Sequence, residues 1–288
     1  MPTTHPSGLL GDFLRARREA LNESDLVILC LPDDAARESV SLIENNSVRV
    51  IDASTAYRVA EGWVYGFAEL EPGNYERIAA AKRVSNPGCW ATGFLALARP
   101  LVAAGLLPAA FPVTVHGVSG YSGGGKVMIE EFEKKDSPAF VETVQRGYAL
   151  GLSHKHIPEM QARAGLAHAP LFAPTVARFY RGMLVEVPLQ LWALPSAPKP
   201  RDLHAVLANA YAGRPLVEVA GLDEAAQMKL LDAELLAGSN RMKLFVFANE
   251  ATGQARLVAA LDNLGKGAGG AAVQNLNIML GLDEGLGL

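Results

Sequence analysis

The chain has 288 residues, of which 50% are hydrophobic and 19% are charged, enough to bury one large core or two moderate ones, and we expect two domains. Its net charge of −4 provides no general attraction to nucleic acid or to an anionic membrane, which leaves a small molecule as the expected partner. Neither cysteine belongs to a Cys/His ligand pattern, no apolar stretch could span a bilayer, and the first residues do not resemble a signal peptide. We therefore expect a soluble cytoplasmic protein without a bound metal.

The first third of the chain alternates strands and helices. LVILCLP (26–32) is a continuous apolar run typical of a strand buried on both faces, which predicts a core position for Cys30. A helix follows, with Asp33 or Asp34 as its N-cap, and VRVIDAS (48–54) is a second strand. This order predicts a parallel sheet whose ligand-binding loops lie at the carboxyl ends of the strands.

SNPGCWATG (85–93) places Cys89 at the start of a predicted helix, 90–105. A third strand, ending at 83–86, delivers this cysteine to the same sheet edge as the ligand loops. A helix N-terminus favours thiolate and leaves backbone N–H groups free, and both suit a nucleophile in acyl transfer. The local pattern alone indicates equally well a small apolar residue that fills the helix start, because cysteine is often buried.

Beyond Pro108 the pattern becomes that of a mostly antiparallel sheet. Alternating or apolar segments predict strands at 111–120, 184–194, 214–221, 242–250 and 254–262, and helices at 126–135 and 201–211. This half of the chain is therefore expected to form an α+β domain with one face of its sheet covered. The last predicted helix, 271–282, carries Val273, Leu276 and Leu280 on one side.

Three further features could carry chemistry. The glycine-rich GVSGYSGGGK (117–126) has an open backbone that could lie against phosphate or a flat cofactor, although a flexible hairpin tip explains it equally well. SHKHIPEMQ (153–161) offers His154 and His156 for proton transfer near neutral pH, with a functionless surface pair as the alternative. Three arginines, Arg58, Arg178 and Arg181, could hold a carboxylate or phosphate through their guanidinium groups. Exposed ion pairs explain them equally well.

Seven segments, in order along residues 21–288, carry a family resemblance. They are LCLPDDAAR, DASTAYR, WVYGFAEL, SNPGCWATG, HGVSGYSGGGK, KHIPEM and GAAVQNLNIMLGL. Together they resemble N-acetyl-γ-glutamyl-phosphate reductase of arginine biosynthesis, in its shorter type. The resemblance implies an α/β plus α+β fold: an incomplete Rossmann-like nucleotide-binding domain, 1–86, with a C-terminal helix, 267–288, packed back on it. A glyceraldehyde-phosphate-dehydrogenase-like catalytic and dimerisation domain, 87–266, follows.

The resemblance also implies a reaction and its residues. Cys89 attacks the γ-acyl phosphate of N-acetylglutamyl phosphate, releases phosphate and forms a thioester that NADPH reduces, with His156 as the acid/base group. The implied cofactor contacts are Pro32, Ser54, Ser119, Gly120, Gln274 and Asn275, and the implied substrate contacts are Arg58, Arg178 and Arg181. A capping or interface role suits Gln274 and Asn275 equally well. The expected assembly is a homodimer or homotetramer.

Two departures from the family pattern bear on these expectations. Trp90 stands beside the nucleophile where Tyr or Phe is more usual. Family members also begin with a strand, a glycine-rich turn and a helix that hold the cofactor pyrophosphate. PSGLLGDFLRARRE (6–19) is either a remnant of that turn, with Gly8 and Gly11, or a polar helix before the strand at 26–32, and we favour the helix. The phosphate-binding turn is then missing, so either the true start lies upstream or the cofactor binds differently and weakly.

These departures leave other activities open. The chain could reduce another acyl phosphate, such as aspartyl phosphate. If the cofactor-binding site is lost, Cys89 and His156 could act in a cofactor-free thiol acyl transferase or hydrolase. A non-catalytic subunit derived from the enzyme is the third possibility.

Overall fold

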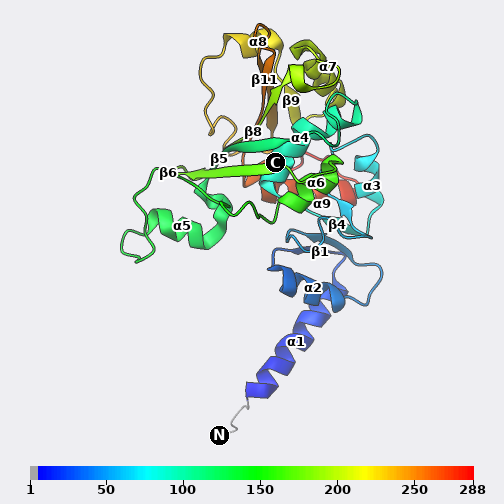
Figure 1. Cartoon of the computed structure of the whole chain (residues 1–288). Coiled ribbons are helices and arrows are strands. Elements are labelled where there is room, and N and C mark those ends of the chain that lie inside the picture. Colours follow the sequence, from blue (N-terminus) through cyan, green and yellow to red (C-terminus); the bar gives the residue numbers. More distant parts are fainter. Residues whose placement is uncertain (1–5) are drawn as a thin grey trace.

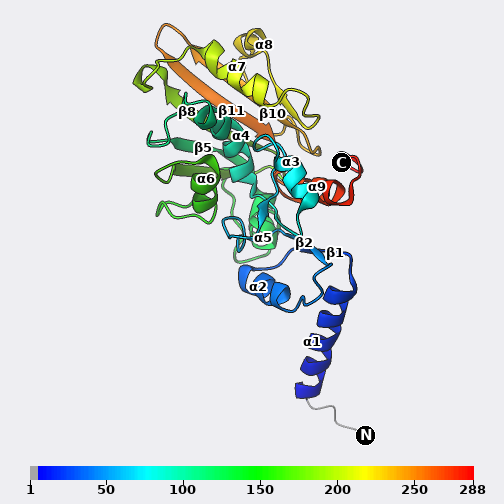
Figure 2. The ribbon, with the colours of Figure 1, turned by 90° about the vertical axis from the view of Figure 1, so that its right-hand side faces the viewer.

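The computed structural model describes residues 6–288 and contains two sheets with helices around them (Figures 1 and 2). The smaller sheet lies near the N-terminal helix α1 (Pro6–Glu23), which projects away from the body in both views. The larger sheet forms the opposite end of the molecule. This arrangement confirms the predicted α/β plus α+β fold.

The smaller sheet is parallel throughout, with strand order β1-β2-β4-β3. Its strands are β1 (Leu26–Leu29), β2 (Arg49–Asp52), β3 (Val64–Tyr65) and β4 (Arg83–Ser85), and its connecting helices are α2 (Asp33–Ser41) and α3 (Asn74–Ala80). The strand–helix–strand order of the sequence predicted the parallel pairing of β1 with β2. Strand β3 and helix α3 were not predicted, because each is too short to show a clear hydrophobic period.

Strand β1 is less buried than its apolar sequence suggested. Within the described residues it pairs only with β2, so its other edge is open, and Ile28 is 39% exposed. The prediction that Cys30 lies in the core is wrong, since this residue is exposed. The helical reading of residues 6–19 is confirmed, because Gly8 and Gly11 lie within α1 and form no turn.

The acidic residues at the start of α2 do not act as the predicted caps. Pro32 occupies the N-cap position, and no side chain caps the helix. The Asp33 carboxylate instead accepts hydrogen bonds from the Thr55 backbone N–H at 2.9 Å and from its hydroxyl at 2.6 Å. This contact ties together the loops that follow β1 and β2.

The larger sheet has seven strands in the order β6-β7-β5-β8-β11-β10-β9. They are β5 (Thr114–Gly120), β6 (Gln145–Gly147), β7 (Leu171–Ala177), β8 (Met183–Gln190), β9 (Val217–Val219), β10 (Met242–Asn249) and β11 (Gln254–Leu261). Only the pairs β5–β7 and β9–β10 are parallel, so the sheet is mostly antiparallel, as predicted. Strands β6 and β7 were not predicted.

Helix α4 (Cys89–Ala103) packs against the inner face of the larger sheet and forms the main core with it. Phe94, Leu97 and Leu101 are fully buried there beside Val185 and Leu257. Burial of one such side chain stabilises the fold by about 1.5–3 kcal/mol. The remaining helical segments are η1 (Tyr121–Gly124), α5 (Gly125–Glu133), α6 (Ile157–Ala164), η2 (Leu191–Ala193), α7 (Pro200–Ala210), α8 (Leu222–Gln227), the π-helix η3 (Gly265–Gly269) and α9 (Gly270–Leu280).

Helix α9 buries a different side from the one its apolar residues predicted. Leu280 is 50% exposed, whereas Gln274 and Asn275 are buried. The helix lies beside α3 and β2, where Ile278 and Met279 join a small apolar core. Burying the two amides is possible because both are hydrogen-bonded to neighbouring elements.

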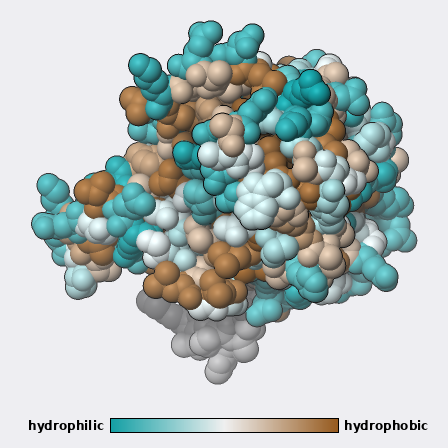
Figure 3. Space-filling view, turned by 45° about the horizontal axis from the view of Figure 1, so that its top comes forward, coloured by the Kyte–Doolittle hydropathy of each residue, from teal (hydrophilic) through white to brown (hydrophobic). Residues whose placement is uncertain are grey.

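The surface mixes polar and apolar side chains over the face shown in Figure 3, with the lobe around α5 standing out from the body. Within residues 6–288, no helix combines the length and apolarity needed to cross a membrane. The same residues contain no cluster of His, Cys, Asp and Glu suited to a metal ion.

Candidate active site

Cys89 is the first residue of α4 and follows Gly88, which occupies the N-cap position. The short β4 and the Asn-Pro-Gly turn deliver it there, as the sequence predicted. The Trp90 backbone N–H donates to the Cys89 sulfur and favours the thiolate, but burial outweighs this effect and raises the pKa of the thiol to about 11. Burial of the thiol therefore opposes the thiolate that the helix start favours.

Cys89 lies on a cavity of 470 Å³ between the two sheets. Cys30 and Ala53, which follow β1 and β2, reach one side of it. The glycine-rich segment reaches another side as the end of β5, η1 and the start of α5, rather than as a free hairpin tip. The ligand loops and the nucleophile thus meet at one sheet edge, as predicted from the topology.

His156 lines the same cavity at the N-cap of α6. It is 5% exposed, and its Nδ1 atom has no hydrogen-bond partner in the structure. Burial and the nearby Arg58 guanidinium hold the pKa of His156 well below 6.5, so the imidazole is neutral. His154 also reaches the cavity, and burial lowers its pKa to about 4.

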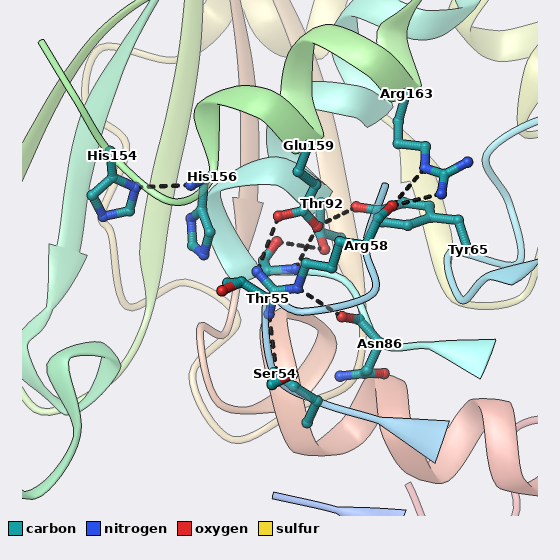
Figure 4. A network of polar contacts seen from close by, with 12 residues as sticks. Ser54, Thr55, Arg58, Tyr65, Asn86, Thr92, His154, His156, Glu159 and Arg163 are labelled. Atoms are coloured by element: carbon teal, nitrogen blue, oxygen red, sulfur yellow. Dashed lines mark hydrogen bonds and ion pairs between the residues drawn. The ribbon is translucent and has the colours of Figure 1, made fainter. Parts of the chain in front are cut away.

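Arg58 and Glu159 form a buried ion pair beside the cavity, with Arg58 Nη1 and Glu159 Oε2 3.0 Å apart (Figure 4). Glu159 also accepts hydrogen bonds from the Tyr65 hydroxyl at 2.6 Å and from the Gly88 backbone N–H at 2.9 Å. Arg58 lines the cavity, but its Nε and Nη2 atoms donate to the carbonyls of Asn86 and Ala53. Its donors are therefore largely used within the protein.

The other two arginines lie away from the cavity wall. Arg178 donates to the carbonyls of Phe132, Val141 and Thr143. Arg181 is half exposed, with its Nε atom 3.6 Å from Asp262. The geometry brings neither guanidinium to Cys89.

The predicted cofactor residues are divided between the cavity and its surroundings. Ser119 and Gly120 line the cavity. Pro32 and Ser54 do not line it. Pro32 occupies the N-cap position of α2, and the Ser54 hydroxyl donates to Asp52 at 2.6 Å.

The two amides of α9 lie behind the cavity wall rather than on it. Gln274 bonds to Glu69 at 3.0 Å and accepts from Lys266 Nζ at 2.6 Å. Asn275 donates to the Gly66 carbonyl at 2.8 Å and to the Asn86 side chain at 3.1 Å. These contacts fix the position of α9 relative to the smaller sheet.

Sequence reasoning missed several groups of the site. Glu159 lies in the KHIPEM segment three residues after His156, a spacing that places both near one face of the helix start. Lys155 and Tyr148 line the cavity as well. No motif marked Tyr148, because the loop that carries it has no regular period.

The π-helix η3 forms the wall directly against the nucleophile. A Cβ at Gly267 would lie 2.6 Å from the Cys89 Cβ, so only glycine allows this approach. A π-turn inside a helical segment is often found at functional sites. Here it places bare backbone beside the thiol.

Replacing Gly267 by alanine is expected to lower the free energy of unfolding by about 1–3 kcal/mol, because the new methyl group overpacks the wall against Cys89. Gly269→Ala is the matched control in the same turn, since its Cβ would meet only the Leu264 carbonyl at an ordinary 3.4 Å. The free energy of unfolding of this control should rise by up to about 1 kcal/mol, because alanine lowers the conformational entropy of the unfolded chain. Urea denaturation measures the free energy of unfolding of both variants. Equal effects of the two substitutions would contradict the close contact between Gly267 and Cys89.

Comparison with known proteins agrees with this arrangement. The semialdehyde dehydrogenase NAD binding domain matches residues 11–79, and the semialdehyde dehydrogenase dimerisation domain matches residues 89–263. N-acetyl-gamma-glutamyl-phosphate reductase of Trichormus variabilis is 53% identical over 94% of this chain and 86% of that protein. The chain belongs to the N-acetyl-gamma-glutamyl-phosphate reductase family. Another member, from Chelativorans sp., is 56% identical over 92% of this chain and 85% of its own length.

Solved structures show the same fold at low sequence identity. Aspartate semialdehyde dehydrogenase II from Vibrio cholerae has a TM-score of 0.65 and 14% identity, covering 90% of this chain and 80% of that one. Aspartate semialdehyde dehydrogenase from Francisella tularensis has a TM-score of 0.64 and 12% identity, with coverages of 91% and 84%. Likeness at this level concerns the fold alone.

Trp90, which the resemblance marked as a departure from Tyr or Phe, is accommodated by packing. It is 2% exposed and meets Phe172 edge to face, with ring centroids 5.2 Å apart. Its larger ring therefore occupies the core behind Cys89.

The cavity walls fit the nicotinamide end of the dinucleotide that the NAD binding domain implies. Gly120, Gly123 and Gly124 form one wall, and Gly267 and Gly269 lie in another. Walls of bare backbone let a flat ring approach the thiol closely. The cavity continues to the carboxyl ends of β1 and β2, the usual side for a nucleotide.

Proposed function

We propose that the chain catalyses the NADPH-dependent reduction of N-acetyl-L-glutamyl 5-phosphate to N-acetyl-L-glutamate 5-semialdehyde and phosphate, a step of arginine biosynthesis. The observation that carries the proposal is the convergence of Cys89 and a neutral, buried His156 on one cavity of the right size for a small molecule. Relatives 53% and 56% identical bear the name of this reductase.

The first half of the reaction needs a nucleophile and a base. The Cys89 sulfur attacks the acyl carbon while His156 accepts the thiol proton, which its unprotonated state allows. Free backbone N–H groups at the start of α4 stabilise the oxyanion. Collapse of the tetrahedral adduct expels phosphate, which takes up a proton from solvent, and leaves a thioester on Cys89.

The second half releases the aldehyde. NADPH, when bound, supplies the hydride that reduces the thioester carbonyl. His156, now carrying the proton, returns it to the departing Cys89 sulfur and restores the resting pair.

The polar ends of the substrate need their own contacts. Lys155 is an exposed cation on the cavity wall, and we assign it to the phosphate of the substrate. We also propose Ser119 and Gly120 as cofactor contacts, and their position in the cavity lining supports this assignment.

We further propose the division of the chain into a nucleotide-binding unit, 1–86 with 267–288, and a catalytic unit, 87–266. The packing of α9 on α3 and β2 supports this division. A homodimer or homotetramer in the cytoplasm completes the proposal, and the dimerisation domain matched by residues 89–263 supports the assembly.

The reverse reaction tests the activity. We expect phosphate-dependent reduction of NADP⁺ with N-acetylglutamate semialdehyde, followed by NADPH absorbance. Aspartate semialdehyde is the matched control and should react poorly. A preference for aspartate semialdehyde would assign a different acyl phosphate, and release of phosphate from the acyl phosphate without NADPH consumption would indicate an acyl hydrolase.

A further inference from the structure

Lys266 is a cation buried behind the wall that faces the nucleophile. Its side chain is 1% exposed, and it directly precedes Gly267 in the π-helix η3. Gly267, Ala268 and Gly269 line the cavity, whereas Lys266 does not. A buried ammonium group is costly unless it is paired, so its contacts indicate what this residue does.

The ammonium group of Lys266 joins three segments of the chain. Its Nζ atom lies 2.7 Å from Glu69 Oε1, in the loop after β3, and donates to Gln274 Oε1 of α9 at 2.6 Å. Gln274 Nε2 donates to the same Glu69 oxygen at 3.0 Å. Burial alone would raise the pKa of Glu69, but the Lys266 ammonium group lowers it below its ordinary value, so this carboxylate is charged. One buried ion pair therefore connects η3 and α9 to the smaller sheet.

The π-helix η3 depends on contacts of this kind. A π-helix is rare, so neighbouring segments must hold the turn in this form. The Gly267 N–H donates to the Asp262 carbonyl, five residues earlier, at 2.9 Å. Asn86, which follows β4, donates from Nδ2 to the Ala268 carbonyl at 2.9 Å. Two side chains from the side of the smaller sheet thus hold η3, Asn86 through the backbone and Glu69 through Lys266.

The wall that these contacts hold already touches the nucleophile. A Cβ at Gly267 would lie 2.6 Å from the Cβ of Cys89 and 3.2 Å from its Cα. Ala272, in the first turn of α9, lines the same cavity. Because the backbone of η3 is as close to Cys89 as packing allows, a release of η3 can only widen the cavity beside the thiol.

We infer that Lys266 is a positioning residue: its buried contacts with Glu69 and Gln274 hold η3 against Cys89 and set the width of the cavity beside the thiol. The catalytic meaning of this inference rests on the proposed function, in which the acyl group and the flat ring of the dinucleotide meet at this point. A misplacement of about 1 Å between reacting groups can cost about 10²-fold in rate. The position of the wall is itself a property of the free protein.

Lys266→Met combined with Glu69→Gln tests the inference. Removing both charges together avoids leaving one of them buried without a partner, and the new amide can still bond to Gln274. All variants carry Cys30→Ser, which leaves Cys89 as the sole thiol, and Cys30→Ser alone is the parent. Iodoacetamide at pH 8 measures the reactivity of Cys89 in the free protein. We expect alkylation about tenfold faster than in the parent, because the thiol becomes more accessible.

The kinetic constants should report the same displacement. With N-acetylglutamate semialdehyde, phosphate and NADP⁺, kcat should fall about 10²-fold in the double variant. The KM for phosphate should change by less than about threefold, because Lys266 does not line the cavity. A urea titration shows whether the variant is folded under the assay conditions, which separates a displaced wall from a loss of folded protein.

Arg99→Met combined with Glu71→Gln is the matched control. This pair joins the same loop to α4, with Arg99 Nη2 and Glu71 Oε2 2.6 Å apart, and neither residue lines the cavity. Its alkylation rate and kcat should stay within about twofold of the parent. Gln274→Met keeps both charges and removes one contact of Lys266, so it should raise the alkylation rate about threefold. This milder variant keeps the test available if the first double variant fails to fold.

An unchanged alkylation rate or an unchanged kcat in Lys266→Met with Glu69→Gln would overturn the inference. The same holds for an unchanged alkylation rate in Gln274→Met, or for an equal rise in the Arg99 and Glu71 control. Alkylation needs neither substrate nor cofactor. Absence of turnover by the parent would therefore count against the proposed function alone, and the alkylation rates would still decide whether Lys266 holds the wall.

Discussion

Cys89→Ser is expected to reduce phosphate-dependent turnover of N-acetylglutamate semialdehyde by at least about 10⁴-fold, the scale seen when a catalytic nucleophile is removed. A serine hydroxyl ionises far less readily than a thiol and would form an oxygen ester, which resists reduction more than a thioester. Neutral His156 cannot compensate, because its pKa is held well below 6.5 by burial and Arg58. Initial rates at saturating NADP⁺ and phosphate measure the effect.

The serine variant should remain folded, because the substitution is nearly isosteric and Cys89 makes only one hydrogen bond of note, from the Trp90 N–H. Its urea midpoint should therefore lie close to that of the parent. Residual activity above about 1% would mean that Cys89 is not the covalent nucleophile.

His156→Asn is expected to reduce kcat/KM by about 10²–10⁴-fold, the usual contribution of a positioned acid/base group. Asparagine keeps a polar side chain of similar size but cannot exchange a proton. The pH dependence of kcat/KM in the unsubstituted enzyme gives a second test. Because the pKa of His156 is lowered, its base form persists at pH 6.5, and kcat/KM should fall only well below that pH.

His154→Asn is the matched control for this prediction, since it lies two residues away on the same cavity. It should reduce kcat/KM by less than about tenfold. A larger loss in His154→Asn than in His156→Asn would exchange the roles of the two histidines. An acid limb near pH 6.5 in the parent would show that His156 is not the neutral base described.

The chemistry-bearing segments could be located from the sequence because each combines residue type with local pattern. The Asn-Pro-Gly turn before an apolar run placed Cys89 at a helix start, and the structure confirms it as the first residue of α4. The strand–helix–strand order placed its neighbouring loops at one sheet edge, where the cavity lies. These inferences depend on short-range backbone preferences, which act before any tertiary contact.

The pKa values of the site residues could not be predicted from local sequence in the same way. The helix start predicts a lowered thiol pKa, yet burial raises it to about 11. Two charged neighbours of the thiol, Arg58 and Glu159, are 101 residues apart in the chain. Their pairing depends on how α6 packs beside the smaller sheet, which no local pattern contains.

Burial in strand β1 and helix α9 was misread for a related reason. The apolar run around Cys30 predicts a buried strand, but the described strand is an edge, and Cys30 is exposed. In α9 the apolar side predicted contact, yet Gln274 and Asn275 face inward, where acceptors on other segments take hydrogen bonds from their amide nitrogens. The spacing of apolar residues indicates only which side of an element is buried on average. Specific hydrogen-bond partners can bury a polar side instead.

By itself, the sequence determined the order of most strands and helices, the two kinds of sheet, the family and the position of Cys89 at a helix start, because all of these follow from local residue patterns. Only the tertiary structure decided which charges surround Cys89 and His156, which arginine reaches the cavity and which face of α9 is buried. Those properties arise from contacts between residues far apart in the chain, where burial and paired charges outweigh the local tendency of each segment.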